Sequence, residues 1–344
     1  MKRRTFIQNT SLATIGIMAT TPILNAMEKY RDVVIGHGTH KYKVDLNWGA
    51  LNSSYYPVND CHEMVQDSKG RILLLTNHTK NNVIVYDKSG KLIEVWGTDY
   101  PGAHGLTLKN ENGTDMLYIS DNSRHEVIKT TIDGKVVKIF PYPKESGKYA
   151  SKDLYIPTET AVADNGDVYV ADGYGEQYIM HYNAQGELLN VFGGKGSEDH
   201  LFNNAHGICI DTRNNQAPTL LITARQQNKL KRFSMDGDFI ESYNLPGAFI
   251  CRPVISGNHI YLATIWSGDG GEGTGFVSIL DENNQLISAP GGAAPTYENG
   301  ILNKMHQELK IFHHPHDVCV DDEENLYVAQ WNSGKTYPIK LNRV

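Results

Sequence analysis

Residues 62–77 read HEMVQDSKGRILLLTN, and residues 83–97 read VIVYDKSGKLIEVWG. Each stretch contains two short runs of alternating or clustered apolar residues, and a polar turn that contains glycine separates the two runs. Apolar runs on both sides of such a turn predict a β-hairpin. The two hairpins follow each other along the chain, so this region predicts a unit of four antiparallel strands.

The same unit recurs along the rest of the chain. Its opening pair of strands is found again in residues 104–121, 158–172, 206–224, 252–264 and 316–330. Units of four short strands that repeat in this way are typical of a β-propeller. We therefore expect an all-β protein with six blades.

The two ends of the repeat region predict how the ring closes. The last unit ends near residues 339–341 without a fourth strand, whereas residues 43–49 (KVDLNWG) resemble the fourth strand of the first unit, which also ends in Trp-Gly. An N-terminal strand would then complete the last blade and cover its edge. Residues 288–312 depart from the repeat, and within them residues 302–309 suggest a short helix.

The N-terminus resembles an export signal. Residues 3–7 read RRTFI, residues 12–23 are modestly apolar, and residues 24–26 (LNA) form an acceptable small-residue cleavage site. This order is that of a twin-arginine signal, and the apolar stretch is too short to span a membrane. We expect residues 1–26 to be a signal peptide and residues 27–344 to be a periplasmic or secreted propeller with no membrane-embedded part.

Composition bears on the partners. The chain has 39 acidic and 32 basic residues, a formal net charge of −7, whereas a nucleic-acid-binding face needs an excess of basic residues. We expect no nucleic-acid partner, and a monomer.

The four cysteines include no CxxC pair, which argues against a cysteine-based zinc or redox motif. Cys61 and Cys251 could pair in an oxidising compartment, but nothing in the sequence requires it.

Four histidines open the first strand of their units, namely His62, His104, His206 and His316. In a propeller this strand lines the central channel, so the four imidazoles should point at one axis. Three imidazoles with an open fourth position form a catalytic zinc site. The other interpretation is that histidine begins these strands for packing or hydrogen bonding.

The position after these histidines is acidic in several units. Glu63 and Asp317 follow histidines, and Glu159 follows Thr158 at the equivalent position of its unit, so these three acids could gather near the axis. Carboxylates held close together call for a cation, and carboxylate oxygens combined with backbone carbonyls suit calcium. Ordinary solvated acids in the channel explain the same pattern equally well.

Several of these segments resemble peptidyl-α-hydroxyglycine α-amidating lyase, a family of NHL-type repeat propellers. The resemblance is carried by residues 104–107, 157–162, 169–174, 205–208, 315–318 and Arg225, and it extends over most of residues 55–335. Its most specific parts are the Asp-Gly-Tyr segment at residues 172–174 and the three histidines at 104, 206 and 316.

The resemblance implies a set of site residues. It implies zinc bound by His104, His206 and His316, a catalytic tyrosine at Tyr174, and an active-site arginine at Arg225.

The resemblance also implies a calcium ion held by Asp317 and the carbonyl of Leu106, with Met64 as the candidate from the first unit. The implied reaction begins when zinc binds a carbinol hydroxyl and the tyrosine acts as base, after which a C–N bond breaks to release an amide and glyoxylate. Because the reference pKa of tyrosine is near 10, such a base needs a nearby cation.

The sequence also departs from the family pattern. Residues 76–80 (TNHTK) lack an arginine that the family has there, so that His78 or Lys80 stands near its place. His314 replaces a methionine, and His62 is an additional histidine at the channel mouth. We therefore expect a divergent bacterial relative, a zinc-dependent lyase that breaks a C–N or C–O bond in a small hydroxylated substrate.

Two other functions stay open. A sugar-lactonase-like hydrolase would use a calcium-type oxygen site, and the channel histidines count against it because hard cations prefer oxygen ligands. A non-catalytic NHL-type module would bind protein or glycan on its loop face, and it needs neither converging histidines nor a tyrosine.

Overall fold

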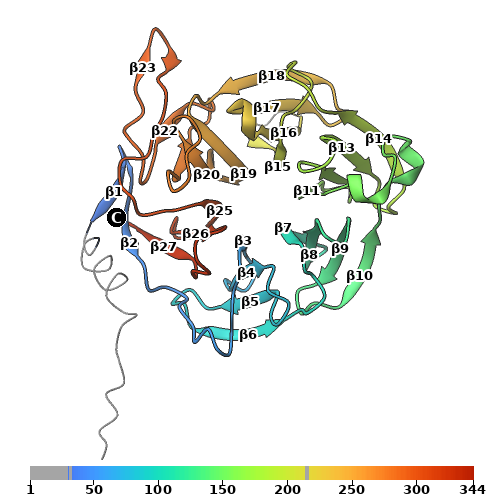
Figure 1. Cartoon of the computed structure of the whole chain (residues 1–344), viewed down its shortest axis with the longest axis horizontal. Helices are drawn as coiled ribbons and strands as arrows, with labels where there is room; N and C mark the ends of the chain where they lie inside the picture. Colours follow the sequence, from blue (N-terminus) through green and yellow to red (C-terminus); the bar gives the residue numbers. More distant parts are fainter. Residues whose placement is uncertain (1–29, 31–32, 214–216) are drawn as a thin grey trace, which may run out of the picture.

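Six antiparallel sheets surround a central axis in the computed structural model, which describes residue 30 and residues 33–213 and 217–344. Figure 1 shows the innermost strands β3, β7, β11, β15, β19 and β25 around the axis. The all-β fold with six blades is therefore confirmed.

The first three blades each contain four strands in chain order. The first has β3 (Cys61–Gln66), β4 (Ile72–Thr76), β5 (Val83–Tyr86) and β6 (Leu92–Trp96). The second has β7 (Ala103–Glu111), β8 (Thr114–Asp121), β9 (Glu126–Thr131) and β10 (Val136–Phe140). The short 3-10 helices η1 (Lys144–Ser146) and η2 (Lys152–Leu154) precede the third, which has β11 (Glu159–Val162), β12 (Val168–Ala171), β13 (Tyr178–Tyr182) and β14 (Leu188–Gly193).

The next two blades follow the same plan. The fourth has β15 (Ala205–Asp211), β16 (Thr219–Ala224), the 3-10 helix η4 (Arg225–Gln227), β17 (Lys229–Ser234) and β18 (Phe239–Asn244). The fifth has β19 (Ala248–Ser256), β20 (His259–Ser267), β21 (Phe276–Leu280) and β22 (Leu286–Ser288).

The sixth blade joins both ends of the described chain. It has β25 (Pro315–Val320), β26 (Leu326–Gln330), β27 (Ile339–Arg343), β2 (His40–Asp45) and β1 (Val34–His37). Val44 on β2 lies opposite Leu341 on β27, so the expected closure by an N-terminal strand is confirmed. The pairing strand lies slightly earlier in the sequence than the expected residues 43–49. Trp48 lies outside it and packs against Tyr327, with ring centroids 4.7 Å apart.

The hairpins depend on turns that begin with aspartate. Asp87 accepts hydrogen bonds from the backbone N–H groups of Ser89 and Lys91, and Gly90 has φ +88°. An aspartate that bonds its own backbone two residues on, followed by a glycine with positive φ, is a stable tight turn. Asp67 makes the same pair of bonds in the other hairpin of this blade, and Asp281 and Asp321 make it in the fifth and sixth blades.

The apolar core lies between neighbouring blades. One cluster, for example, combines Leu73 and Val83 of the first blade with Leu106 and Ile119 of the second, all fully buried. Each blade thus covers its neighbour, and no blade buries its apolar faces alone. This packing fixes the height at which each inner strand enters the channel.

The expected helix at residues 302–309 is wrong. The insertion instead forms a protruding hairpin of β23 (Tyr297–Glu298) and β24 (Ile301–Leu302), seen at the edge of Figure 1. Asn299 and Gly300 have φ +50° and +78°, and an Asn-Gly pair with two positive φ values is the preferred two-residue hairpin turn.

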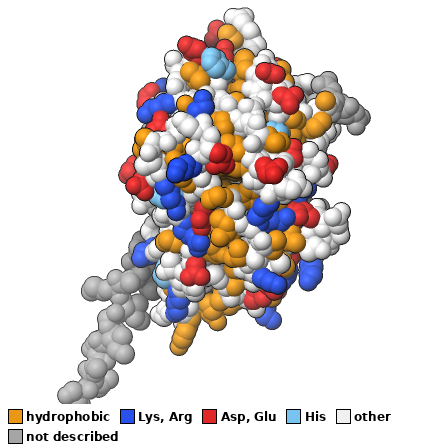
Figure 2. All heavy atoms as spheres, turned by 90° about the vertical axis from the view of Figure 1, so that its right-hand side faces the viewer, with side chains coloured by type: hydrophobic (Ala, Val, Ile, Leu, Met, Phe, Trp, Pro, Cys, Tyr) orange, Lys and Arg blue, Asp and Glu red, His pale blue; other side chains and the backbone are white. Residues whose placement is uncertain are grey.

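The surface and the termini do not indicate where the functional site lies. On the face shown in Figure 2, acidic, basic and apolar side chains are interspersed. Within the described part of the chain, no helix is long and apolar enough to cross a membrane. The export signal expected at residues 1–26 lies outside the described residues.

Candidate metal centre

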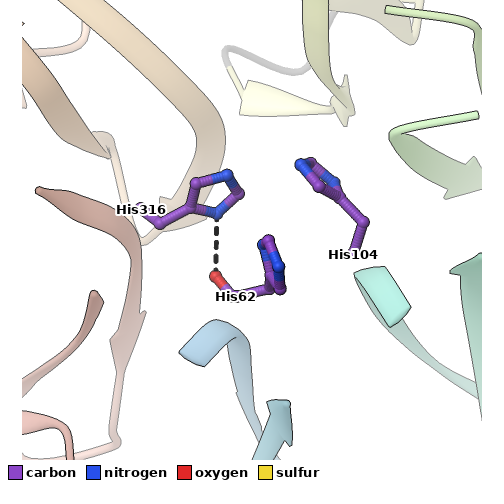
Figure 3. Close-up of side chains that lie close together, drawn as sticks. All are labelled: His62, His104 and His316. Carbon is purple, nitrogen blue, oxygen red and sulfur yellow. Dashed lines mark hydrogen bonds between the residues drawn. The ribbon is translucent and has the colours of Figure 1, made fainter. Parts of the chain in front are cut away.

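Four imidazoles meet on the channel axis. His62, His104, His206 and His316 come from β3, β7, β15 and β25, and their neighbouring ring centroids lie 4.7–5.0 Å apart. Figure 3 shows three of them, His62, His104 and His316, pointing toward one another. We call these four side chains the histidine tier.

Cys251 joins this cluster and was missed by the sequence analysis. Two sets of three residues place possible ligand atoms within 4.8 Å of one another, the first of His62, His104 and His316, and the second of His206, Cys251 and His316. The sequence pattern aligned Arg252 with the histidines, but the β19 register places its neighbour Cys251 at this level. The four cysteines, Cys61 and Cys251 included, are unpaired.

Backbone carbonyls orient two of the rings. Nδ1 of His104 lies 2.9 Å from the carbonyl of Thr158, and Nδ1 of His316 lies 3.0 Å from the carbonyl of His62. A carbonyl can only accept, so Nδ1 carries the proton in both rings and Nε2 presents its lone pair. A hydrogen bond from the nitrogen that does not face the metal is the usual way in which a metal-binding histidine is held.

The tier is neutral and short of hydrogen-bond partners. Burial lowers the pKa of all four imidazoles, that of His62 to about 3, and the neighbouring rings lower the pKa values of the other three further. Among the described residues, Nδ1 of His62, Nδ1 of His206 and Nε2 of His316 are buried without a partner. Neutral imidazoles with free lone pairs are the form that binds metals, and a buried polar atom without a partner needs such an explanation. The residues present therefore fit a metal ion.

Tyr174 reaches into the tier from the loop after β12. Its hydroxyl lies 3.1 Å from Nε2 of His104 and 3.2 Å from Nε2 of His206. Because Nε2 of His104 carries no proton, the hydroxyl donates to it. Tyr174 is 36% exposed, so the ring faces the channel mouth while the hydroxyl lies between the imidazoles.

Arg225 supports this hydroxyl. It begins η4 immediately after β16, is buried, and places Nη2 3.4 Å from the Tyr174 hydroxyl. Its guanidinium lies over the rings of Tyr174 and Trp266, 5.6 and 5.5 Å from their centroids. Burial raises the pKa of Tyr174, and the positive charge of Arg225 opposes that rise.

Two of the possible extra site residues bond elsewhere. Nδ1 of His78 accepts a hydrogen bond from the backbone N–H of Lys80 within its own loop. His314 uses Nδ1 toward the carbonyl of Asn332 and accepts a hydrogen bond from the N–H of Gly273 at Nε2. The third, His62, belongs to the histidine tier.

A second layer of charged groups lies directly below, one residue further along the inner strands. The carboxylate of Asp317 and the carbonyls of Leu106 and Met64 converge, as the calcium prediction requires, but the group that they surround is the guanidinium of Arg252. An ion bound to these three groups would compete with the guanidinium for the same oxygens. The residues present therefore do not fit a calcium ion at this position.

Glu63 and Glu159 complete the charged layer and lie 3.6 and 3.8 Å from Nε of Arg252. Burial and the charge of Glu159 raise the pKa of Glu63. A cavity of about 800 Å³ opens further along the inner strands, is lined partly by Arg252, and has none of the four tier histidines in its wall. Arg252 thus contacts the charged layer and also lines this cavity.

The fold and the site define a class, a six-bladed β-propeller with a histidine-rich candidate metal centre on its axis. Among curated relatives, peptidyl-alpha-hydroxyglycine alpha-amidating lyase 1 of Drosophila melanogaster is 26% identical over 264 residues, which are 71% of this chain and 46% of that protein. The human NHL repeat-containing protein 3 is 21% identical over 213 residues, which are 59% of this chain and 60% of that protein. No protein-family model matches the chain.

A solved structure of streptogramin B lyase supports the fold. It has a TM-score of 0.55 at 16% identity and covers 83% of this chain and 94% of that one. The chain spans about half the length of the curated relatives that it matches, 46% of the Drosophila lyase and 60% of the human protein.

Proposed function

We propose that the chain is an exported zinc-dependent lyase that acts on a small hydroxylated substrate, in the manner of the amidating lyases that it is similar to. The observation that carries the proposal is the position of the Tyr174 hydroxyl, which bridges two imidazoles of the histidine tier with Arg225 beside it. A packing or binding role needs no such convergence of a phenol, a guanidinium and neutral imidazoles.

His104, His206 and His316 would hold the zinc ion, with His62 and Cys251 adjacent. When bound, zinc would supply positive charge beside the substrate hydroxyl and so favour loss of its proton. The buried tier keeps bulk water away from that charge, which strengthens its effect. Bound zinc would take the imidazole lone pairs that the Tyr174 hydroxyl contacts, which would leave this hydroxyl available to the substrate.

The residues of the chain account for the proton transfers. Tyr174, as phenolate, accepts the proton of the carbinol hydroxyl, and Arg225 stabilises the phenolate. The carbinol C–O bond becomes a carbonyl while the C–N bond breaks, and the nitrogen leaves with the electron pair of that bond. Tyr174 returns the proton to the nitrogen, so the products are an amide and an aldehyde, with no redox change.

The test is a product assay on the purified, zinc-loaded chain. With a peptidyl-α-hydroxyglycine substrate, we expect glyoxylate release that depends on enzyme concentration and is abolished by zinc chelation. Absence of glyoxylate from several such substrates would overturn the amidating activity. Hydrolysis of sugar lactones supported by calcium alone would favour the lactonase, and binding of protein or glycan without turnover would favour the NHL-type module.

A further inference from the structure

Arg252 lies at the centre of the charged layer, only 9% exposed. Its Nε and Nη2 donate to the two carboxylate oxygens of Asp317 at 3.0 and 2.8 Å. Nη1 donates to the carbonyl of Leu106 at 3.1 Å, and Nη2 donates to the carbonyl of Met64 at 3.0 Å. One side chain on β19 thus bonds to three other inner strands, β25, β7 and β3.

The surrounding groups are those that a hard divalent cation takes. They are the carboxylates of Asp317, Glu63 and Glu159 and two backbone carbonyls, and all three carboxylates are at most 1% exposed. Oε2 of Glu159 is buried and has no hydrogen-bond partner among the described residues. Without a central positive charge, three buried carboxylates would repel one another with little solvent screening.

We propose that the guanidinium of Arg252 is the built-in cation of this propeller, which joins four blades at the axis in place of a bound metal ion and positions the histidine tier above it. Its planar fork presents several N–H groups in fixed directions, so it satisfies a carboxylate and two carbonyls at once, which an ammonium group does not.

The backbone around Arg252 is shaped for this side chain. A Cβ atom at Gly207 would lie 2.5 Å from Cα of Arg252, so only glycine lets β15 approach β19 this closely. Gly105 likewise allows close contact between β7 and the backbone of Glu159. The two glycines at this level therefore let the blades close around the charged layer.

The charged layer is connected to the tier through adjacent residues. Asp317 follows His316, and Glu63 follows His62 along their strands. The carboxylate of Asp317 also accepts the backbone N–H of Met64, and the carboxylate of Glu63 accepts that of Leu106. Arg252 thus fixes the strands next to the residues that carry the imidazoles, which makes it a positioning residue for the metal centre.

The experiment replaces the guanidinium and offers calcium instead. Arg252→Ala should lower the melting temperature, and Ca²⁺ at about 1 mM, within the range that extracellular calcium modules bind, should restore most of the loss. The same variant should gain Tb³⁺ luminescence at one site per chain. The wild-type melting temperature should respond neither to EGTA nor to Ca²⁺.

A positional readout separates this role from general stability. With Co²⁺ in the histidine tier, we expect Arg252→Ala to weaken Co²⁺ binding at least tenfold and to alter its visible spectrum, and added Ca²⁺ to reverse both changes. A tenfold effect is what loss of a supporting residue near a metal typically causes.

Arg213→Ala is the matched control. Arg213 is also a buried arginine with carboxylate and carbonyl partners, but its carboxylate partner is Asp211, the last residue of β15, and its carbonyl partners are Asn258 and Asp281 of the fifth blade. This variant should lose stability without rescue by Ca²⁺ and without change in the Co²⁺ spectrum.

Two results would overturn the proposal. One is a wild-type chain that binds Ca²⁺ on the axis, seen as a fall in melting temperature with EGTA, a measurement that needs no variant. The other is an Arg252→Ala variant that keeps wild-type stability and Co²⁺ affinity, or that fails to fold with and without Ca²⁺ while Arg252→Lys has wild-type stability and the wild-type Co²⁺ spectrum.

Discussion

At the scale of single residues, a substitution of Tyr174 distinguishes a loss of catalysis from a loss of metal binding. Its hydroxyl contacts two imidazoles, but Tyr174 is not one of the proposed zinc ligands. Tyr174→Phe should therefore lower kcat about 10²- to 10⁴-fold, the range for loss of a general acid–base group, while the zinc content stays that of the wild type. Steady-state kinetics with metal analysis of the same sample checks both.

Tyr178→Phe is the control, because this tyrosine lies on β13 of the same blade, where its ring packs against Tyr149. Equal kcat in Tyr174→Phe and Tyr178→Phe would remove Tyr174 from the chemistry.

Lys231 gives the protein a pH-dependent stability. It lies buried on β17, donates to the carbonyls of Glu198 and Leu201, and burial lowers its pKa from 10.5 to about 8. Between pH 8 and 10.5 the unfolded chain therefore binds more protons at this residue than the folded chain, so its contribution to stability rises with pH. Below pH 8 the contribution is constant.

The measurement is urea unfolding of the wild type and of Lys231→Met from pH 7 to pH 10. The other titratable groups are the same in both proteins, so the difference between their free energies of unfolding isolates Lys231. We expect this difference to shift in favour of the wild type as the pH rises above 8. A difference that does not change with pH would show that Lys231 has an ordinary pKa in the folded chain.

The sequence predicted the residues of the site that depend on repetition. His62, His104, His206 and His316 share one position in the repeat, and a propeller brings equivalent positions to one axis. Cys251 was missed because the fifth unit has no histidine to mark its register. For the same reason the position of Arg252 in the charged layer was not predicted. The hydrogen bonds that Arg252 makes to other blades produce no local sequence pattern.

At the scale of elements, the N-terminal strand β2 holds the ring closed. Tyr42 on this strand is fully buried among residues of the fifth and sixth blades, such as Tyr261 and Leu341. Tyr42→Ala should lower the free energy of unfolding by about 3 kcal/mol, as typical for a buried aromatic side chain replaced by alanine. Urea unfolding followed by tryptophan fluorescence measures the loss.

Lys41→Ala is the matched control on the opposite, exposed face of the same strand. It should change the stability by less than about 0.5 kcal/mol. Equal effects of the two substitutions would mean that β2 does not close the ring in solution.

The elements were predictable wherever the repeat applied, and less so outside it. The ring closure followed from the similarity of residues 43–49 to a fourth strand, although the pairing strand proved to be His40–Asp45. In the insertion, the helical interpretation of residues 302–309 ignored the Asn299-Gly300 turn immediately before. That turn is a strong local hairpin signal, and it determined the structure there.

At the scale of the whole molecule, the propeller converts distant sequence positions into two stacked layers on one axis. The upper layer offers neutral imidazoles and the Tyr174 hydroxyl, and the lower layer balances three carboxylates against the guanidinium of Arg252. The fold could be predicted because its structural repeat is visible as a repeat in the sequence. The substrate could not, since the residues around a bound substrate come from loops that follow no repeat.

The proposed zinc ligands are His104, His206 and His316, and the metal content of the purified chain tests this assignment. We would measure zinc by elemental analysis in the wild type, in His206→Ala and in His78→Ala, whose histidine bonds within its own loop. We expect about one zinc per chain, the number that a single three-histidine site binds, in the wild type and in His78→Ala, and little in His206→Ala. A wild-type chain without zinc after reconstitution, or full zinc content in His206→Ala, would contradict it.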